Sequence, residues 1–121
     1  MGVFRFEDLE VWKLAKEHCD EIGSIIRHPM IQSDPPIRDG LNETAVSVVE
    51  NISEGFEREG RKEFAQFVRI AKGSNGEGRA LLYLARGRGY LEQEEFARLL
   101  NRNTRIGKML RSLYKHLSGP R

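Results

Sequence analysis

The chain has 121 residues, of which 39% are hydrophobic and 31% charged, as expected for one globular domain spanning 1–121 rather than a disordered chain. Its one cysteine excludes an internal disulfide, and no apolar run is long enough to cross a membrane. The acidic N-terminal stretch does not resemble a signal peptide, so we expect a cytoplasmic protein. The net charge of +2 is uneven, because residues 1–59 sum to −7 and residues 60–121 to +9. Such asymmetry suggests an acidic partner for the second half, or one half facing the other.

The first predicted helix runs from about residue 7 to residue 28. Apolar residues follow one another there at steps of three and four, in the order Trp12, Ala15, Cys19, Ile22 and Ile26. Cys19 lies on this apolar stripe, and we interpret it as an inert core thiol. A proline-rich break follows.

The second predicted helix covers about 36–57, with Asp34 as a candidate N-cap. The third covers about 61–87 and contains three glycines in the segment IAKGSNGEGRA. These glycines could mark a loop, but the apolar stripe keeps its phase through them, from Phe64 to Ala85. We therefore predict one continuous helix, possible despite a cost of about 1 kcal/mol per glycine, with small residues allowing a neighbouring helix to approach closely.

The fourth predicted helix covers about 92–117 and ends before Gly119 and Pro120. Four long amphipathic helices with short connections predict an all-α fold, an antiparallel up-down-up-down four-helix bundle.

No arrangement of residues indicates catalysis, a metal or a cofactor. The histidines are far apart in sequence, and the glycine segment lacks the pattern of a phosphate-binding loop. We expect no enzyme, no metal site and no cofactor. Polar residues on or beside the apolar stripes favour a hydrogen-bonded set that fixes helix register, and could alternatively form a polar site. These residues are Asn51, Ser74, Glu77 and Asn103.

The fourth helix carries the main candidate site, a basic face that could neutralise phosphates. Its candidate nucleic-acid-binding residues are Arg98, Arg102, Arg105, Lys108, Arg111 and Lys115. No aromatic ladder accompanies them, so we expect contacts mainly to the nucleic-acid backbone. The alternative is that acids of the first helix pair with this face, within the monomer or across a subunit interface.

Several motifs occur in a fixed order: FEDLEVWK at 6–13, AVSVVENISEGF at 45–56, KEFAQF at 62–67, IAKGS at 70–74 and GYL at 89–91. Together they resemble the bacterial four-helix-bundle family that includes proteins encoded in intervening sequences of large-subunit ribosomal RNA genes. The accessory variability determinant of diversity-generating retroelements belongs to the same family.

The resemblance implies a barrel-shaped homopentamer without catalytic activity. It also implies a basic surface that binds a reverse transcriptase and its RNA, and for this chain we expect RNA or DNA as the ligand. The early second helix departs from the family in having Asn42-Glu43-Thr44 where relatives carry basic residues. Our leading hypothesis is a nucleic-acid-binding accessory protein of a retroelement. The alternative is an oligomeric structural or adaptor protein whose charged faces serve protein–protein contacts.

Overall fold

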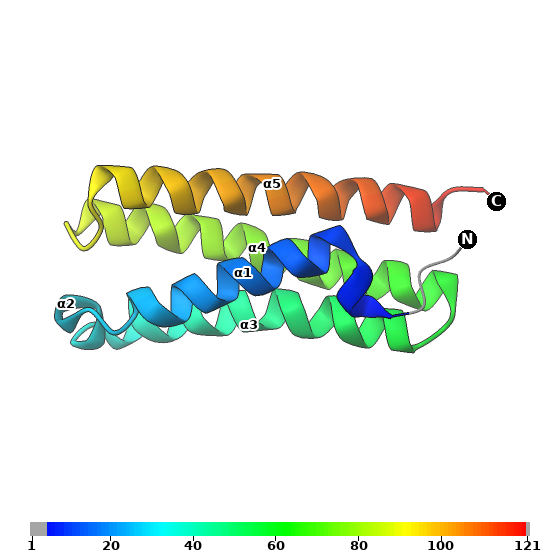
Figure 1. Ribbon diagram of the computed structural model, residues 1–121, viewed down its shortest axis with the longest axis horizontal. Coiled ribbons are helices and arrows are strands. Elements are labelled where there is room, and N and C mark those ends of the chain that lie inside the picture. The colour runs from blue at the N-terminus through cyan, green and yellow to red at the C-terminus, as the bar shows by residue number, and fades with distance from the viewer. Residues whose placement is uncertain (1–4, 121) are drawn as a thin grey trace.

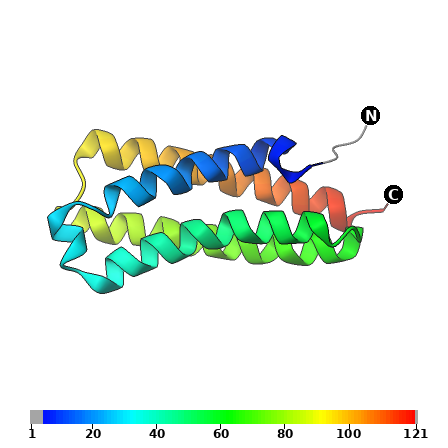
Figure 2. The same ribbon diagram turned by 60° about the horizontal axis from the view of Figure 1, so that its bottom comes forward.

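The computed structural model describes residues 5–120. They form an all-helical bundle without strands, as the sequence predicts. A short 3-10 turn, η1 (Phe6–Asp8), precedes α1 (Glu10–Ile25), α2 (Pro29–Gln32), α3 (Pro35–Glu57), α4 (Arg61–Gly87) and α5 (Gln93–Ser118). In Figure 1 the chain follows α1 from right to left, α3 back, α4 to the left again and α5 to the right. α3 packs on α4, α4 on α5, and α1 covers α3 and α5. The turned view in Figure 2 shows the same helices side by side.

The first helix is shorter than expected. Leu9 has an extended backbone (φ −72°, ψ 128°) and separates η1 from α1. At the other end, turn residues follow Ile25 and the proline-rich break contains the short helix α2. α3 begins with Pro35 and Pro36, whose fixed φ suits the first helical turn. Asp34 occupies the N-cap position but its side chain does not cap the helix.

The carboxylate of Asp34 ties the two loops at this end of the bundle together. Its Oδ2 accepts hydrogen bonds from Arg88 (2.6 Å) and from the Tyr90 hydroxyl (2.8 Å). Both donors belong to the connection between α4 and α5, where Gly89 adopts φ +80°, a conformation that favours glycine. The hydroxyl of Tyr90 and the guanidinium of Arg88 hold the pKa of Asp34 below its usual value.

α4 runs without interruption through the glycine segment. Only Gly78 packs there: a Cβ on it would come within 3.0 Å of the Thr44 hydroxyl oxygen, whereas Gly73 and Gly76 face open space. The tightest helix approach lies elsewhere, at Gly55 of α3, where a Cβ would be 2.7 Å from the Cβ of Phe67.

The core consists of two apolar clusters separated by a polar layer. One cluster, near α2, includes Ile22, Ile37, Leu82 and Leu99. The other, near η1, includes Val11, Ile52, Val68 and Ile106. Between them, each long helix contributes one buried polar residue, and these four are His18, Thr44, Asn75 and Asn103. All four line a central cavity of about 10 Å³, roughly the room that one water requires.

Candidate nucleic-acid interface

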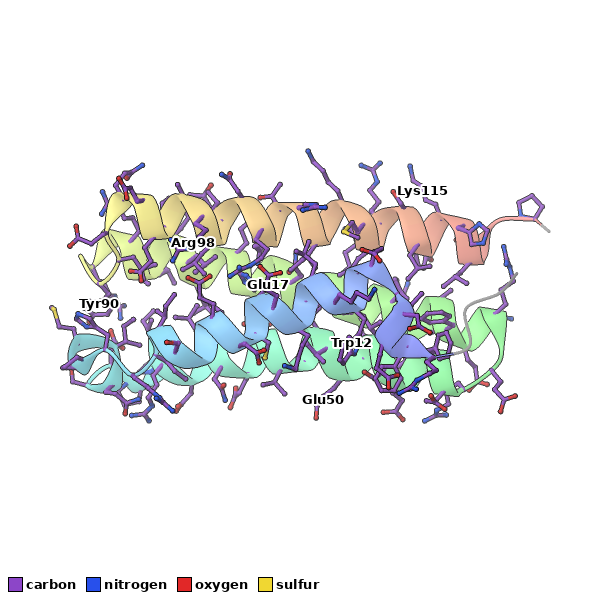
Figure 3. The ribbon with its side chains drawn as sticks, viewed as in Figure 1. Trp12, Glu17, Glu50, Tyr90, Arg98 and Lys115 are labelled. Atoms are coloured by element: carbon purple, nitrogen blue, oxygen red, sulfur yellow. The ribbon has the colours of Figure 1, made fainter. Side chains whose placement is uncertain are left out.

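The charges of the bundle are divided between its helices. α3 carries five acids and one arginine, whereas α4 and α5 each carry six Lys or Arg and two Glu. In Figure 3, Glu50 projects from α3 and Lys115 from α5 on opposite sides of the bundle. The molecule therefore presents one acidic and one basic side.

Ion pairs leave most of the basic side free. Among residues 5–120, the cations in ion pairs include Arg98 and Arg102 of α5 but none from α4. The exposed cations of α4 and α5 outside these pairs include Arg69, Lys72, Arg79, Arg105, Lys108, Arg111 and Lys115. Four of the six candidate residues predicted on the last helix are thus exposed and outside the described ion pairs.

The other two, Arg98 and Arg102, face acids of α1. The Arg98 guanidinium donates to Glu21, and Arg102 donates to Glu21 Oε1 (2.5 Å) and Glu17 Oε2 (3.3 Å). The Arg102 side chain is only 11% exposed. Figure 3 shows Arg98 and Glu17 on the facing helices α5 and α1. This is the pairing with the acidic first helix that the sequence left open as an alternative.

His18 belongs to the same network and was not among the predicted site residues. Arg102 Nε donates to His18 Nδ1 over 3.0 Å, so the imidazole must be neutral to accept this bond. Burial, together with the charge of Arg102, lowers the pKa of His18 to about 4. The cluster of His18, Arg102, Glu17, Glu21 and Arg98 is therefore a charged clamp between α1 and α5.

The predicted polar set is only partly assembled as expected. Asn103 is buried and exchanges hydrogen bonds with Asn75, which donates to the Asn103 carbonyl (2.9 Å) and accepts from Asn103 Nδ2 at its own carbonyl (3.1 Å). Ser74 bonds Ser47 across α3 and α4 (2.8 Å), and Asn51 donates to the same Ser47 side chain (3.0 Å).

Glu77 must be removed from this set. It is exposed, while Asn75, two residues earlier, takes the buried position. The physical reason is a rotation of the buried face of α4. This face includes Val68, Ala71, Asn75, Gly78 and Leu82, which places Glu77 toward solvent.

A groove between α4 and α5 lies on the basic side. Its walls carry Lys72 and Arg79 from α4 and Lys108 and Arg111 from α5, its floor includes Gly76 and Gly107, and its volume is about 200 Å³. No acidic residue lines it. A multiply charged anion could enter this groove without meeting a like charge.

Other kinds of site are not assembled in the part of the chain that the structure describes. Over residues 5–120, no three His, Cys, Asp or Glu side chains gather in a way that could hold a metal ion. Within the same range, no helix is long and apolar enough to cross a membrane. Cys19 is half-buried against an apolar cluster, and burial raises the pKa of its thiol.

The fold and this surface define a helical-bundle protein with one strongly basic side. Residues 7–112 match the family model of the 23S rRNA-intervening sequence protein, so the chain belongs to that family. A search of curated proteins found no match. Among solved structures, the chain is similar to a protein of unknown function from the S23 ribosomal protein family of Bacteroides thetaiotaomicron, with a TM-score of 0.81 and 23% identity over 87% of this chain and 98% of that one. At this identity the likeness concerns the fold.

Proposed function

We propose that the protein is a non-enzymatic accessory protein that binds RNA or DNA through the exposed cations of α4 and α5. The observation that carries this proposal is the free basic side: Lys108, Arg111 and Lys115 are exposed and stand outside the ion pairs of residues 5–120. Membership of a family named for an intervening sequence of 23S rRNA supports a link to nucleic acid.

The binding surface differs from the basic face as the sequence defined it. Arg98 and Arg102 serve the clamp to α1, while Lys72 and Arg79 of α4 extend the remaining surface across the groove. Arg105, Lys108, Arg111 and Lys115 remain the phosphate-neutralising residues of α5. Such contacts displace counterions from nucleic acid, so binding should weaken steeply with salt.

The test is fluorescence anisotropy of a labelled structured RNA and a duplex DNA across a salt series. The triple variant Lys108→Glu, Arg111→Glu and Lys115→Glu should weaken binding and flatten the log–log salt slope by roughly 2 to 3, at about 0.9 per lost phosphate contact. The matched control, Lys13→Glu, Lys16→Glu and Arg27→Glu, makes the same charge change on the α1 side. Equal losses in both triple variants would refute the assignment to α5.

Family resemblance supports two finer proposals. The bundle, in up-down-up-down topology, would assemble as a homopentamer, and its partner would be a reverse transcriptase of a diversity-generating retroelement. Co-purification of the protein with the reverse transcriptase encoded beside its gene, with and without RNA, tests the partner. Sedimentation tests the pentamer.

A second candidate function uses the same charges between copies of the chain. Glu50 of acidic α3 and Lys115 of basic α5 project from opposite sides of the bundle, which would suit a head-to-tail contact that closes into a ring. In this oligomeric adaptor, high salt would dissociate the subunits. In the nucleic-acid-binding protein it would release the nucleic acid from an intact assembly. Light scattering across the salt series separates the two.

A further inference from the structure

An exposed aromatic ring continues the line of groove residues on α4. Lys72, Gly76, Arg79 and Tyr83 follow one another at steps of four, three and four, so they share one face of the helix. Tyr83 is 55% exposed. Its ring lies against Phe96 of α5, with centroids 5.4 Å apart in an edge-on arrangement. Tyr83 therefore stands at the same α4–α5 seam as the groove, seven residues or about 10 Å along the helix from Gly76.

The seam thus combines two features that proteins use to hold unpaired nucleic acid. Basic residues on both walls can follow a phosphate backbone, and an exposed aromatic ring offers a face for a base. A duplex buries the faces of its bases within the stack and could use only the basic walls. An exposed ring beside basic walls would therefore favour single strands over duplexes, which cations alone would not do.

Packing does not explain the glycine at position 76 of this seam. Gly76 faces open space, so its lack of a side chain serves no close helix contact, yet glycine weakens a helix relative to alanine. At the floor, Gly76 keeps the groove open between Lys72 and Arg79. Phe96 packs against the core, and its edge-on contact with Tyr83 fixes the position of the Tyr83 ring.

We propose that the seam between α4 and α5 binds a single-stranded segment of RNA or DNA, with its phosphates between the basic walls and one unpaired base stacked on Tyr83. This proposal rests on the proposed function. It adds that the ligand is single-stranded and that Tyr83 is the residue that contacts an unpaired base. The sequence alone favoured backbone contacts without stacking, because the aromatic residue lies on α4 rather than on the basic helix α5.

The experiment compares Tyr83→Leu with Tyr83→Phe. Leucine keeps an apolar contact to Phe96 but removes the aromatic face, whereas phenylalanine keeps both. The matched control is Leu84→Ala, which removes the neighbouring exposed apolar side chain of the same helix (51% exposed). Circular dichroism and thermal unfolding first establish that all variants are folded at the assay temperature.

The probes are fluorescein-labelled single-stranded RNA and DNA of one sequence and the corresponding duplexes. Tyr83→Leu should weaken binding of single strands on the order of 10-fold, the effect of losing one stacked base, with an unchanged salt slope. Tyr83→Phe and Leu84→Ala should remain within about twofold of the wild type, and duplex affinity should be the same in all variants, since none changes a phosphate contact. A single strand carrying 2-aminopurine should lose fluorescence on binding to the wild type, and lose less with Tyr83→Leu.

The outcomes separate the two proposals. If the wild type binds no nucleic acid at low salt, the proposed function fails and this inference fails with it. If the wild type binds but Tyr83→Leu matches Leu84→Ala on single strands, nucleic-acid binding stands and the stacking site is refuted. Unequal losses on RNA and DNA strands would identify which of the two the seam holds.

Discussion

Arg102 of α5 donates from Nε to Nδ1 of His18 on α1, 3.0 Å away, while its two terminal nitrogens reach Glu17 and Glu21. One guanidinium therefore joins a buried neutral imidazole to two carboxylates. The bundle places this charged clamp beside the polar layer that divides its core. The stability of the fold and the availability of its cations both depend on this arrangement.

Acid should weaken the bundle through His18. The pKa of His18 is lowered to about 4 in the folded protein, because burial and the charge of Arg102 disfavour the imidazolium. In the unfolded chain the His18 imidazole has an ordinary pKa of about 6.5, so it binds a proton at a higher pH than in the folded protein. The free energy of unfolding therefore has its full value above that pH and falls as pH drops toward 4. The full loss is about 3 kcal/mol. Urea unfolding between pH 7 and pH 4 measures it.

His18→Gln provides the control for the acid effect, because it keeps a polar group that cannot titrate. Its unfolding free energy should change less between pH 6.5 and pH 4.5. Below that range Glu21 adds to the loss of stability in both the wild type and the variant. Hydrogen bonding from Arg98 lowers its pKa, so its stabilisation is lost as pH falls through the lowered value. An identical pH profile for wild type and His18→Gln would contradict the role of His18.

The two arginines of the clamp should differ in their effect on stability. Arg102→Ala leaves buried His18 without its donor and half-buried Glu21 with Arg98 alone, and should cost about 2 to 3 kcal/mol of unfolding free energy. Arg98 is 54% exposed, and Arg98→Ala should cost only about 0.5 kcal/mol, as surface ion pairs do. Guanidinium unfolding of both variants compares them. Equal costs would mean that the burial of Arg102 does not determine its contribution.

Asn75 and Asn103 should be energetically coupled. Each amide donates to the carbonyl of the other residue inside the core. Asn103→Ala removes the bond to the Asn75 main-chain carbonyl and the 3.3 Å bond that Asn75 Nδ2 donates to Asn103 Oδ1, and should cost about 1 to 3 kcal/mol. A double-mutant cycle with Asn75→Ala should give an interaction free energy of about 1 kcal/mol. Asn101→Ala, at an exposed position of the same helix, is the control and should be nearly neutral. Additive effects of the two core changes would show that the pair is not coupled.

The sequence predicted the helical content well, because the apolar stripes at steps of three and four persist through each long segment. It predicted the buried face of α1 less well. A stripe sought among apolar residues passes through Trp12 and Cys19, whereas the buried face passes through Val11, Ala15, His18 and Ile22, at steps of four, three and four. The regular spacing of His18 with its apolar neighbours was the signal that could have revealed it.

The same cause explains Asn75 and Glu77. When a polar layer crosses the core, the inward position of a helix is occupied by a polar residue, and hydrophobicity alone rotates the inferred face by about one residue. From the sequence, the clamp between α1 and α5 could be predicted only as an alternative to a basic face that binds nucleic acid. Opposite charges on α1 and α5 indicate that pairing is possible, but which arginines pair depends on which turns of the two helices face each other. That relationship follows from three-dimensional packing.

Replacement of glycine by alanine should destabilise the protein at Gly55 and stabilise it at Gly73. Gly55→Ala places a Cβ 2.7 Å from the Cβ of Phe67 and 2.9 Å from the Phe64 ring. α3 and α4 would have to separate, at a cost of about 1 to 3 kcal/mol. Gly73→Ala meets nothing within 4 Å and should stabilise α4 by roughly 0.5 to 1 kcal/mol through helix propensity.

Thermal unfolding of both glycine variants is the measurement, with circular dichroism at 222 nm as the signal. The melting temperature should fall for Gly55→Ala and rise for Gly73→Ala. If Gly73→Ala lowered it, the outward side of α4 would be packed against something in solution, such as a second copy of the chain. Repeating that melt over a range of protein concentrations decides the point, since a contact between copies makes the melting temperature depend on concentration and a contact within one chain does not.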